Sequence, residues 1–142
     1  MDTLYRTLDG RRDIKPDFIS VTYSAGGSGN NNDATFRIAA SIMGYGMESA
    51  AHLPCIGLTK QDVCEKLNKL KNIGVENILA LRGDLPAGNC APGDFEHASD
   101  LIAFIKEQGE FNIIAACYPE GHVEAKNKVE DIQNLKRKVD AG

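Results

Sequence analysis

Four short strand-like runs alternate with helical runs along this chain, and this alternation most restricts the folds open to it. The runs are 18–23, 51–56, 78–81 and 113–117, and their starts recur about every 30 residues, the length of one βα unit. They are β-branched and apolar on both faces, as is typical of parallel strands that helices cover. The pattern predicts an α/β fold built from successive βα units, and it leaves an open parallel sheet and a barrel as alternatives.

Apolar residues at helical spacing fill the intervals between these runs. The sequence Thr59–Asp62 resembles a capping box, and Gly74 stands where the same helix would end. The predicted helices span 2–12, 33–43, 59–74, 95–105 closed by Gly109, and a last helix from 129 that ends at Ala141-Gly142. The apolar positions that mark them are Leu4 and Leu8; Phe36, Ala39, Ala40 and Met43; Val63, Leu67 and Leu70; Phe95, Ala98, Leu101, Ile102 and Ile105; and Val129, Ile132, Leu135 and Val139.

Composition limits the function classes. The 142 residues suit one globular domain, with 42% hydrophobic and 25% charged residues. A net charge of −4 argues against nonspecific binding to nucleic acid or to an anionic membrane. No apolar run approaches the roughly 20 residues of a membrane span, and no secretory leader is visible. We therefore expect a cytoplasmic protein with no nucleic-acid or membrane partner.

The four cysteines, Cys55, Cys64, Cys90 and Cys117, form no C-x-x-C pair, and only three histidines accompany them. This pattern predicts no structural zinc site and no other metal site. Cys55 and Cys117 lie in strand-like runs, so we expect them to be small buried hydrophobic residues with reduced thiols.

Polar residues follow the strand-like runs, most distinctly at Arg82-Gly83-Asp84. In α/β folds ligands gather at the carboxyl ends of strands. A guanidinium and a carboxylate beside a glycine offer anion binding, an acceptor and close backbone approach. The other polar strand ends are Thr22 and Tyr23 with Ala25-Gly26-Gly27, His52 within its run, and Tyr118 to His122. Four such ends suggest a shared rim, which favours a barrel over an open sheet.

Each of these features also has an ordinary structural explanation. The glycine loop matches neither G-x-G-x-x-G nor a P-loop and is typical of a βα turn. His52 taken alone would be a hydrogen-bonded core histidine. Residues Asp131, Asn134, Arg137 and Lys138 fall at helical spacing and would form a solvated helix face.

Taken together, the segments resemble a known family. They are PDFISVTY (16–23), AGG (25–27), AHLPC (51–55), NILALRGDLP (77–86), ASDL (98–101), YPEGH (118–122), EA (124–125) and LKRKVDAG (135–142). In order and spacing they resemble the methylenetetrahydrofolate reductases, flavin enzymes of one-carbon metabolism. Pro54, Ser24 and His97 depart from the family's usual residues, which are threonine, glycine and often tyrosine.

The resemblance implies an eight-stranded (βα) barrel that holds FAD at the carboxyl ends of its strands. It implies ping-pong hydride transfer from NAD(P)H through FAD to methylenetetrahydrofolate. Asp84 would be the catalytic carboxylate, which tunes the flavin and stabilises the cationic iminium form of the substrate. Thr22 and Asp84 would contact the folate. The residues implied to contact FAD are Tyr23, Ala25, His52, Arg82, Gly83, Asp84, His97, Ala98, Tyr118, His122, Ala125, Asp131, Asn134, Arg137 and Lys138.

A complete barrel needs about 250 residues. We therefore expect residues 1–142 to be a single incomplete barrel domain that holds strands two to five. The first strand, with the family's general-acid glutamate, and the C-terminal half would be missing. Such a chain is expected to lack activity alone and to form homo-oligomers through open sheet edges. Two alternatives stay open: a barrel for another phosphate-bearing ligand, and a non-catalytic half-barrel module completed by a partner chain.

Overall fold

Four parallel strands form the centre of the computed structural model, which describes residues 2–10, 12–23, 32–84 and 93–142. The strands are β1 (Phe18–Val21), β2 (Glu48–Pro54), β3 (Asn77–Leu81) and β4 (Asn112–Ala115), and they pair in the order β1-β2-β3-β4. Each strand pairs with the next one in sequence, as successive βα units require. The predicted α/β fold is confirmed, and the arrangement is that of part of a TIM barrel.

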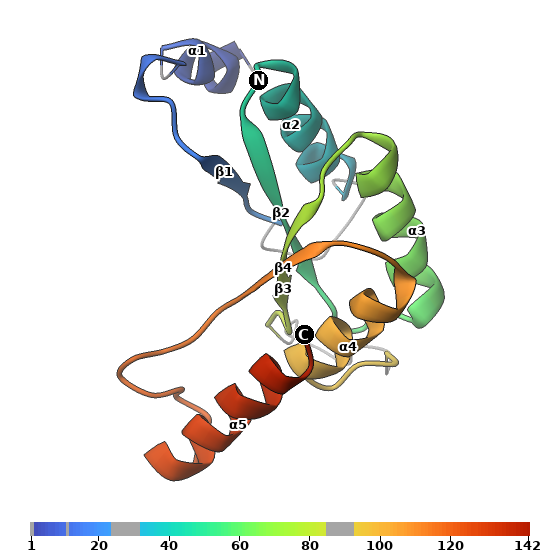
Figure 1. Cartoon of the computed structure of the whole chain (residues 1–142), viewed down its shortest axis with the longest axis vertical. Coiled ribbons are helices and arrows are strands. Elements are labelled where there is room, and N and C mark those ends of the chain that lie inside the picture. Colours follow the sequence, from blue (N-terminus) through green and yellow to red (C-terminus); the bar gives the residue numbers. More distant parts are fainter. Residues whose placement is uncertain (1, 11, 24–31, 85–92) are drawn as a thin grey trace.

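Helices connect the strands. They are α1 (Asp2–Asp9), α2 (Asn32–Gly44), α3 (Lys60–Asn72), α4 (Ala98–Gln108) and α5 (Lys128–Asp140), with a 3-10 turn, η1 (Arg12–Ile14). In Figure 1, α2 and α3 flank one side of the strands, and α5 lies next to α4 near the carboxyl terminus. Helices α2 and α3 thus lie on the same side of the sheet (Figure 1).

The core lies between these helices and one face of the sheet. In β3, Ile78 and Ala80 are buried, whereas Leu79 and Leu81 on the other face are partly exposed. On the edge strand, Phe18 is 50% exposed. The buried residues of α2, α3 and α4 join Ile78 and Ala80 in one core, as in part of a (βα) barrel. The buried helical residues are Leu8; Phe36, Ala39 and Ile42; Val63, Leu67 and Leu70; and Leu101, Ile102 and Ile105.

Several boundaries differ from the predicted ones. Strand β2 begins at Glu48 rather than residue 51, because it pairs with β1 from its first residue, and it ends at Pro54 before a turn at Gly57. The leading helix stops at Asp9. Helix α4 begins at Ala98 rather than residue 95, because the Asp100 carboxylate accepts the backbone N–H of His97 at 2.8 Å and so fixes the first turn.

Two predicted burial patterns are also corrected. Cys55 is fully buried, as expected, but Cys117 is exposed because β4 ends at Ala115 and the chain leaves the sheet before it. The apolar positions that mark the last helix are exposed on α5 rather than packed: Val129 (66%), Ile132 (65%), Leu135 (39%) and Val139 (69%). Cys90 lies outside the described residues.

Candidate functional site

The carboxyl ends of the four strands lie along one edge of the sheet, because the strands are parallel and adjacent. We call this edge the rim. Thr22 and Tyr23 follow β1, Arg82 to Asp84 follow β3, and the segment that leads to Tyr118 follows β4. The predicted convergence of polar strand ends is therefore present in the fold. Ala25, Gly26 and Gly27 lie outside the described residues.

The strongest polar contact at the rim joins Arg82 to Glu124. The two terminal guanidinium nitrogens of Arg82 donate to the carboxylate oxygens of Glu124 at 2.7 and 2.9 Å. The Nε–H of Arg82 donates to the carbonyl oxygen of Gly83 at 3.3 Å. The hydrogen bonds raise the pKa of Arg82 and lower the pKa of Glu124, so the pair is ionised at neutral pH.

Glu124 stood in a matching segment of the sequence without an assigned role. One signal could have identified it. Glu124 is an acidic residue that follows β4, the strand next to β3, and its charge is opposite to that of Arg82. A bidentate arginine–carboxylate pair has a fixed plane and direction. The contact therefore fixes the segment before α5 against the end of β3.

Gly83 allows the ends of β2 and β3 to lie close together. Its φ is +86°, and a Cβ there would lie 3.0 Å from the Cβ of Pro54 and 3.1 Å from Cγ2 of Ile56. The backbone thus turns sharply between Arg82 and Asp84. The Asp84 side chain is exposed at the rim, and its charge contributes to the raised pKa of Arg82.

His52 lies on β2, and its ring is held by a side chain of β1. The Oγ of Ser20 and Nε2 of His52 are 2.6 Å apart. Burial lowers the pKa of His52, which favours the neutral ring at pH 7. The hydrogen bond of the ring is present, but His52 is partly exposed rather than a core residue, and its contact with a flavin stays a prediction. Sequence reasoning did not identify Ser20.

A hollow of about 160 Å³ lies between the segment after β4 and the start of α5. The backbone N–H of His122 donates to Oδ2 of Asp131 at 3.1 Å, and Nδ1 of His122 accepts the backbone N–H of Glu124 at 3.1 Å. The rings of Tyr118 and His122 pack edge-on, with centroids 4.9 Å apart. The hollow is lined by Glu120, Gly121, His122, Ala125, Asn127, Lys128 and Asp131. Three residues predicted to contact FAD therefore lie together.

The remaining predicted residues of α5 occupy its next turns. Lys138 Nζ donates to the carbonyl oxygen of Ala116 at 2.7 Å and so connects α5 to the end of β4. A guanidinium nitrogen of Arg137 donates to Oδ1 of Asn134 at 2.8 Å, and both side chains are exposed. The structure thus places two cations on the helix that borders the hollow.

The predicted residues on α4 and β1 lie further along the rim. His97 and Ala98 stand at the start of α4, and the buried Cys55 thiol lies 3.8 Å from the carbonyl oxygens of both Arg82 and His97. Burial raises the pKa of Cys55 to about 11, so the thiol stays protonated. Tyr23 is half-buried, with a lysine amine 5.8 Å from its ring centroid, and Thr22 is exposed.

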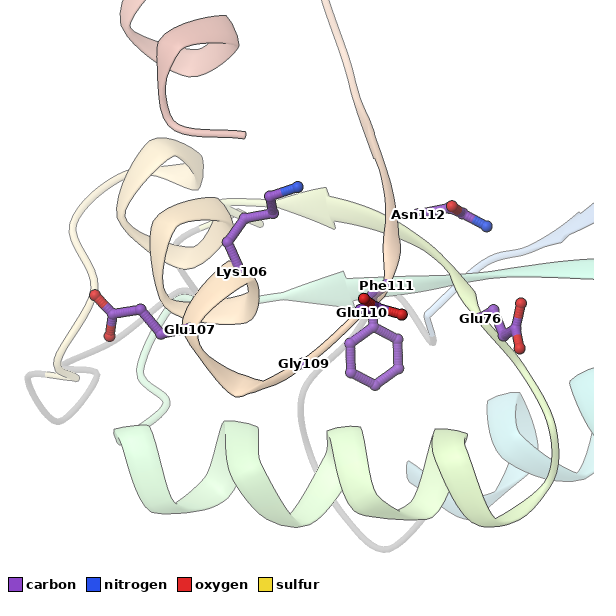
Figure 2. A pocket seen from close by; sticks show the side chains of 7 residues that line it. All are labelled: Glu76, Lys106, Glu107, Gly109, Glu110, Phe111 and Asn112. Carbon is purple, nitrogen blue, oxygen red and sulfur yellow. The ribbon is translucent and has the colours of Figure 1, made fainter.

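A larger hollow of about 590 Å³ lies at the opposite edge of the sheet, where β3 and β4 begin. Figure 2 shows its lining: Glu76, Lys106, Glu107, Gly109, Glu110, Phe111 and Asn112. None of these residues follows the carboxyl end of a strand. This larger hollow is therefore separate from the rim. Within the described ranges, no three His, Cys, Asp or Glu side chains are grouped as metal ligands, and no helix could span a membrane.

Comparisons with known proteins give a consistent result. The family model described as "Methylenetetrahydrofolate reductase" matches residues 1–142. The chain is 43% identical over 141 residues to the 5,10-methylenetetrahydrofolate reductase of Escherichia coli (strain K12). The matched region covers 99% of this chain and 46% of that protein. It is 37% identical over 151 residues to methylenetetrahydrofolate reductase 2 of Saccharomyces cerevisiae, covering all of this chain and 25% of that protein. The chain thus spans less than half the length of these relatives.

Proposed function

Because this chain belongs to the methylenetetrahydrofolate reductase family, we propose that it forms part of an FAD site for the reduction of methylenetetrahydrofolate to methyltetrahydrofolate. The observation that carries the proposal is the hollow beside the rim. It is lined by His122, Ala125 and Asp131, and the same segment is bound to Arg82 through Glu124. The lining residues come from one segment, 120–131, which Glu124 joins to Arg82 at the edge where α/β folds bind ligands.

The residues present fit such a cofactor in charge. The turn at Gly83, whose Cβ position is filled by Pro54 and Ile56, brings Arg82 and Asp84 to the rim beside β2. Arg137 and Lys138 would hold the diphosphate, because cations on the helix beside the hollow offset its charge. Tyr23, His52, His97, Ala98, Tyr118 and Asn134 are the further proposed contacts.

In the proposed mechanism, bound FAD would supply the chemistry of hydride transfer between NAD(P)H and the folate. The chain's own residues would bind the cofactor and polarise the folate. Asp84 presents an exposed carboxylate at the rim, where its negative charge would favour the cationic iminium form of the folate. The hydrogen bond with Ser20 would hold the ring of His52 in one orientation.

FAD titration of the purified chain tests this function. We expect saturable quenching of flavin fluorescence by the 142-residue chain, weakened by Lys138→Gln, which removes a proposed diphosphate contact. Glu110→Gln, a change at the opposite edge of the sheet, is the control and should bind as the wild type does. Failure of the wild-type chain to bind FAD would contradict the proposal. We expect no turnover by the chain alone, because one face of its sheet is uncovered in the described residues.

A second candidate is a non-catalytic half-barrel that a partner chain completes. The uncovered sheet face with exposed Phe18 favours it, since such a face is typical of an interaction site. Co-purification of a second polypeptide that supplies further strands, without flavin, would select this candidate.

A further inference from the structure

Three of the five N–H groups of Arg82 already donate within the chain. Both terminal nitrogens donate to Glu124, and Nε donates to the carbonyl oxygen of Gly83. An arginine at a strand end is expected to receive an anion such as phosphate in its fork of N–H groups. Here a carboxylate of the same chain takes that fork. The charge of the guanidinium is balanced locally, and a ligand could meet only its flat faces or the remaining N–H groups beside the carboxylate.

The backbone holds Glu124 in this position. Its N–H donates to Nδ1 of His122, and the N–H of His122 donates to Asp131 on α5. The carboxylate is therefore presented from a segment fixed to a helix. Side-chain exposure is 31% for Arg82 and 57% for Glu124, so the pair contributes little to stability. We therefore expect the Arg82–Glu124 pair to affect the binding of anions more than the stability of the chain.

We propose that Glu124 is a specificity-determining residue, which excludes phosphate from Arg82 and reserves the guanidinium for an uncharged planar ring. A phosphate would have to displace the carboxylate from the fork or bind the remaining N–H groups beside its negative charge, and both are unfavourable. A flat, uncharged heteroaromatic ring has no such conflict, because guanidinium groups stack on aromatic faces. Asp84, the other nearby acidic group, adds to the exclusion of anions.

This inference rests on the proposed function, in which the flavin ring lies against Arg82 and the phosphates lie toward Arg137 and Lys138 on α5. The alternative of a phosphate-bearing ligand bound directly by Arg82 is therefore not favoured.

The test uses inorganic phosphate and the variant Glu124→Gln. In the ¹⁵N-labelled chain, the Nε–H signal of Arg82, assigned with Arg82→Lys, should move little when phosphate is added at constant ionic strength. In the Glu124→Gln chain it should shift in a saturable way, with binding at least about tenfold tighter, equivalent to about 1.4 kcal/mol. Equal phosphate binding by the two chains would overturn the proposal.

Glu110→Gln is the control, because it removes the same charge from an exposed position at the opposite edge of the sheet. If this control gained as much phosphate affinity as Glu124→Gln, net charge alone would control phosphate binding, and the proposal would again be overturned. Glu124→Ala provides a second variant if the glutamine chain does not fold, and it should give the same gain.

Riboflavin and FMN, which differ by one phosphate, provide the link to the flavin site. We expect Glu124→Gln to raise the ratio of FMN to riboflavin affinity, and an unchanged ratio in a chain that binds both would contradict the inference. If the wild-type chain binds no flavin, the proposed function fails, while the phosphate titration still decides the role of Glu124.

Discussion

Gly83 shows how one residue can shape the rim. Its φ of +86° is unfavourable for any residue with a Cβ, and Pro54 and Ile56 occupy the space where that Cβ would lie. Gly46 provides a comparison, because its φ is +76° and nothing lies within 4 Å of its Cβ position. The two glycines therefore share a left-handed backbone conformation, but only the Cβ position of Gly83 is crowded by neighbouring side chains.

We predict that Gly83→Ala destabilises the chain more than Gly46→Ala does. Both variants bear the left-handed backbone cost of about 1–2 kcal/mol. Gly83→Ala should bear about 1–3 kcal/mol more, because its methyl group overpacks against β2. Urea unfolding of both variants measures the difference, and equal losses of unfolding free energy would show that the β2–β3 contact is not tight.

His52 predicts a pH dependence of stability. Burial lowers its pKa in the folded chain, whereas an unfolded histidine titrates near about 6.5. The unfolded chain then binds more protons as the pH falls. The stabilisation is complete above the unfolded pKa and is lost progressively below it. Asp62 and Glu124, with lowered pKa values, lose their contributions only at more acidic pH.

We therefore predict a lower free energy of unfolding at pH 5.5 than at pH 7.5, and a smaller difference in the His52→Gln variant. The glutamine amide can still hydrogen-bond with Ser20 but does not titrate. His97→Gln is the control, because the side chain of His97 is 69% exposed, and it should keep the wild-type difference. The same pH dependence in His52→Gln as in the wild type would rule out this assignment.

At the scale of the helices and strands, local signals were predictable from the sequence and long-range ones were not. The capping box of α3 is confirmed, because Thr59 and Asp62 are three residues apart and exchange hydrogen bonds within one turn. The start of β2 depends instead on pairing with β1. The exposure of Cys117 depends on where β4 ends, which no pattern around it reveals.

The candidate site follows the same division. Arg82, Gly83 and Asp84 could be predicted because the sequence changes character abruptly at a strand end. The Arg82–Glu124 pair joins residues 42 positions apart, so only the placement of the segment after β4 brings them together. Ser20 was missed because a serine within a strand-like run carries no signal by itself, and it gains its role from the neighbouring strand.

At the scale of the whole molecule, the sheet is open. Within the described residues, β1 pairs only with β2 and β4 only with β3, and one sheet face is uncovered. A closed barrel has no strand edges. Open parallel edges and exposed apolar side chains instead favour association with further strands. Phe18 lies on the edge strand β1 and is 50% exposed, so it is the residue at which this association is best tested.

We predict that the purified chain self-associates as its concentration rises, and that Phe18→Lys shifts it toward the monomer. A lysine on an edge strand opposes strand addition because its charge would have to be desolvated or paired. Ile14→Lys is the matched control, because Ile14 is 62% exposed but lies in η1, outside the sheet. Light scattering coupled to size-exclusion chromatography measures the mass of each chain. A monomeric wild type at all concentrations would refute association, whereas equal effects of the two lysines would show that it does not proceed through the β1 edge.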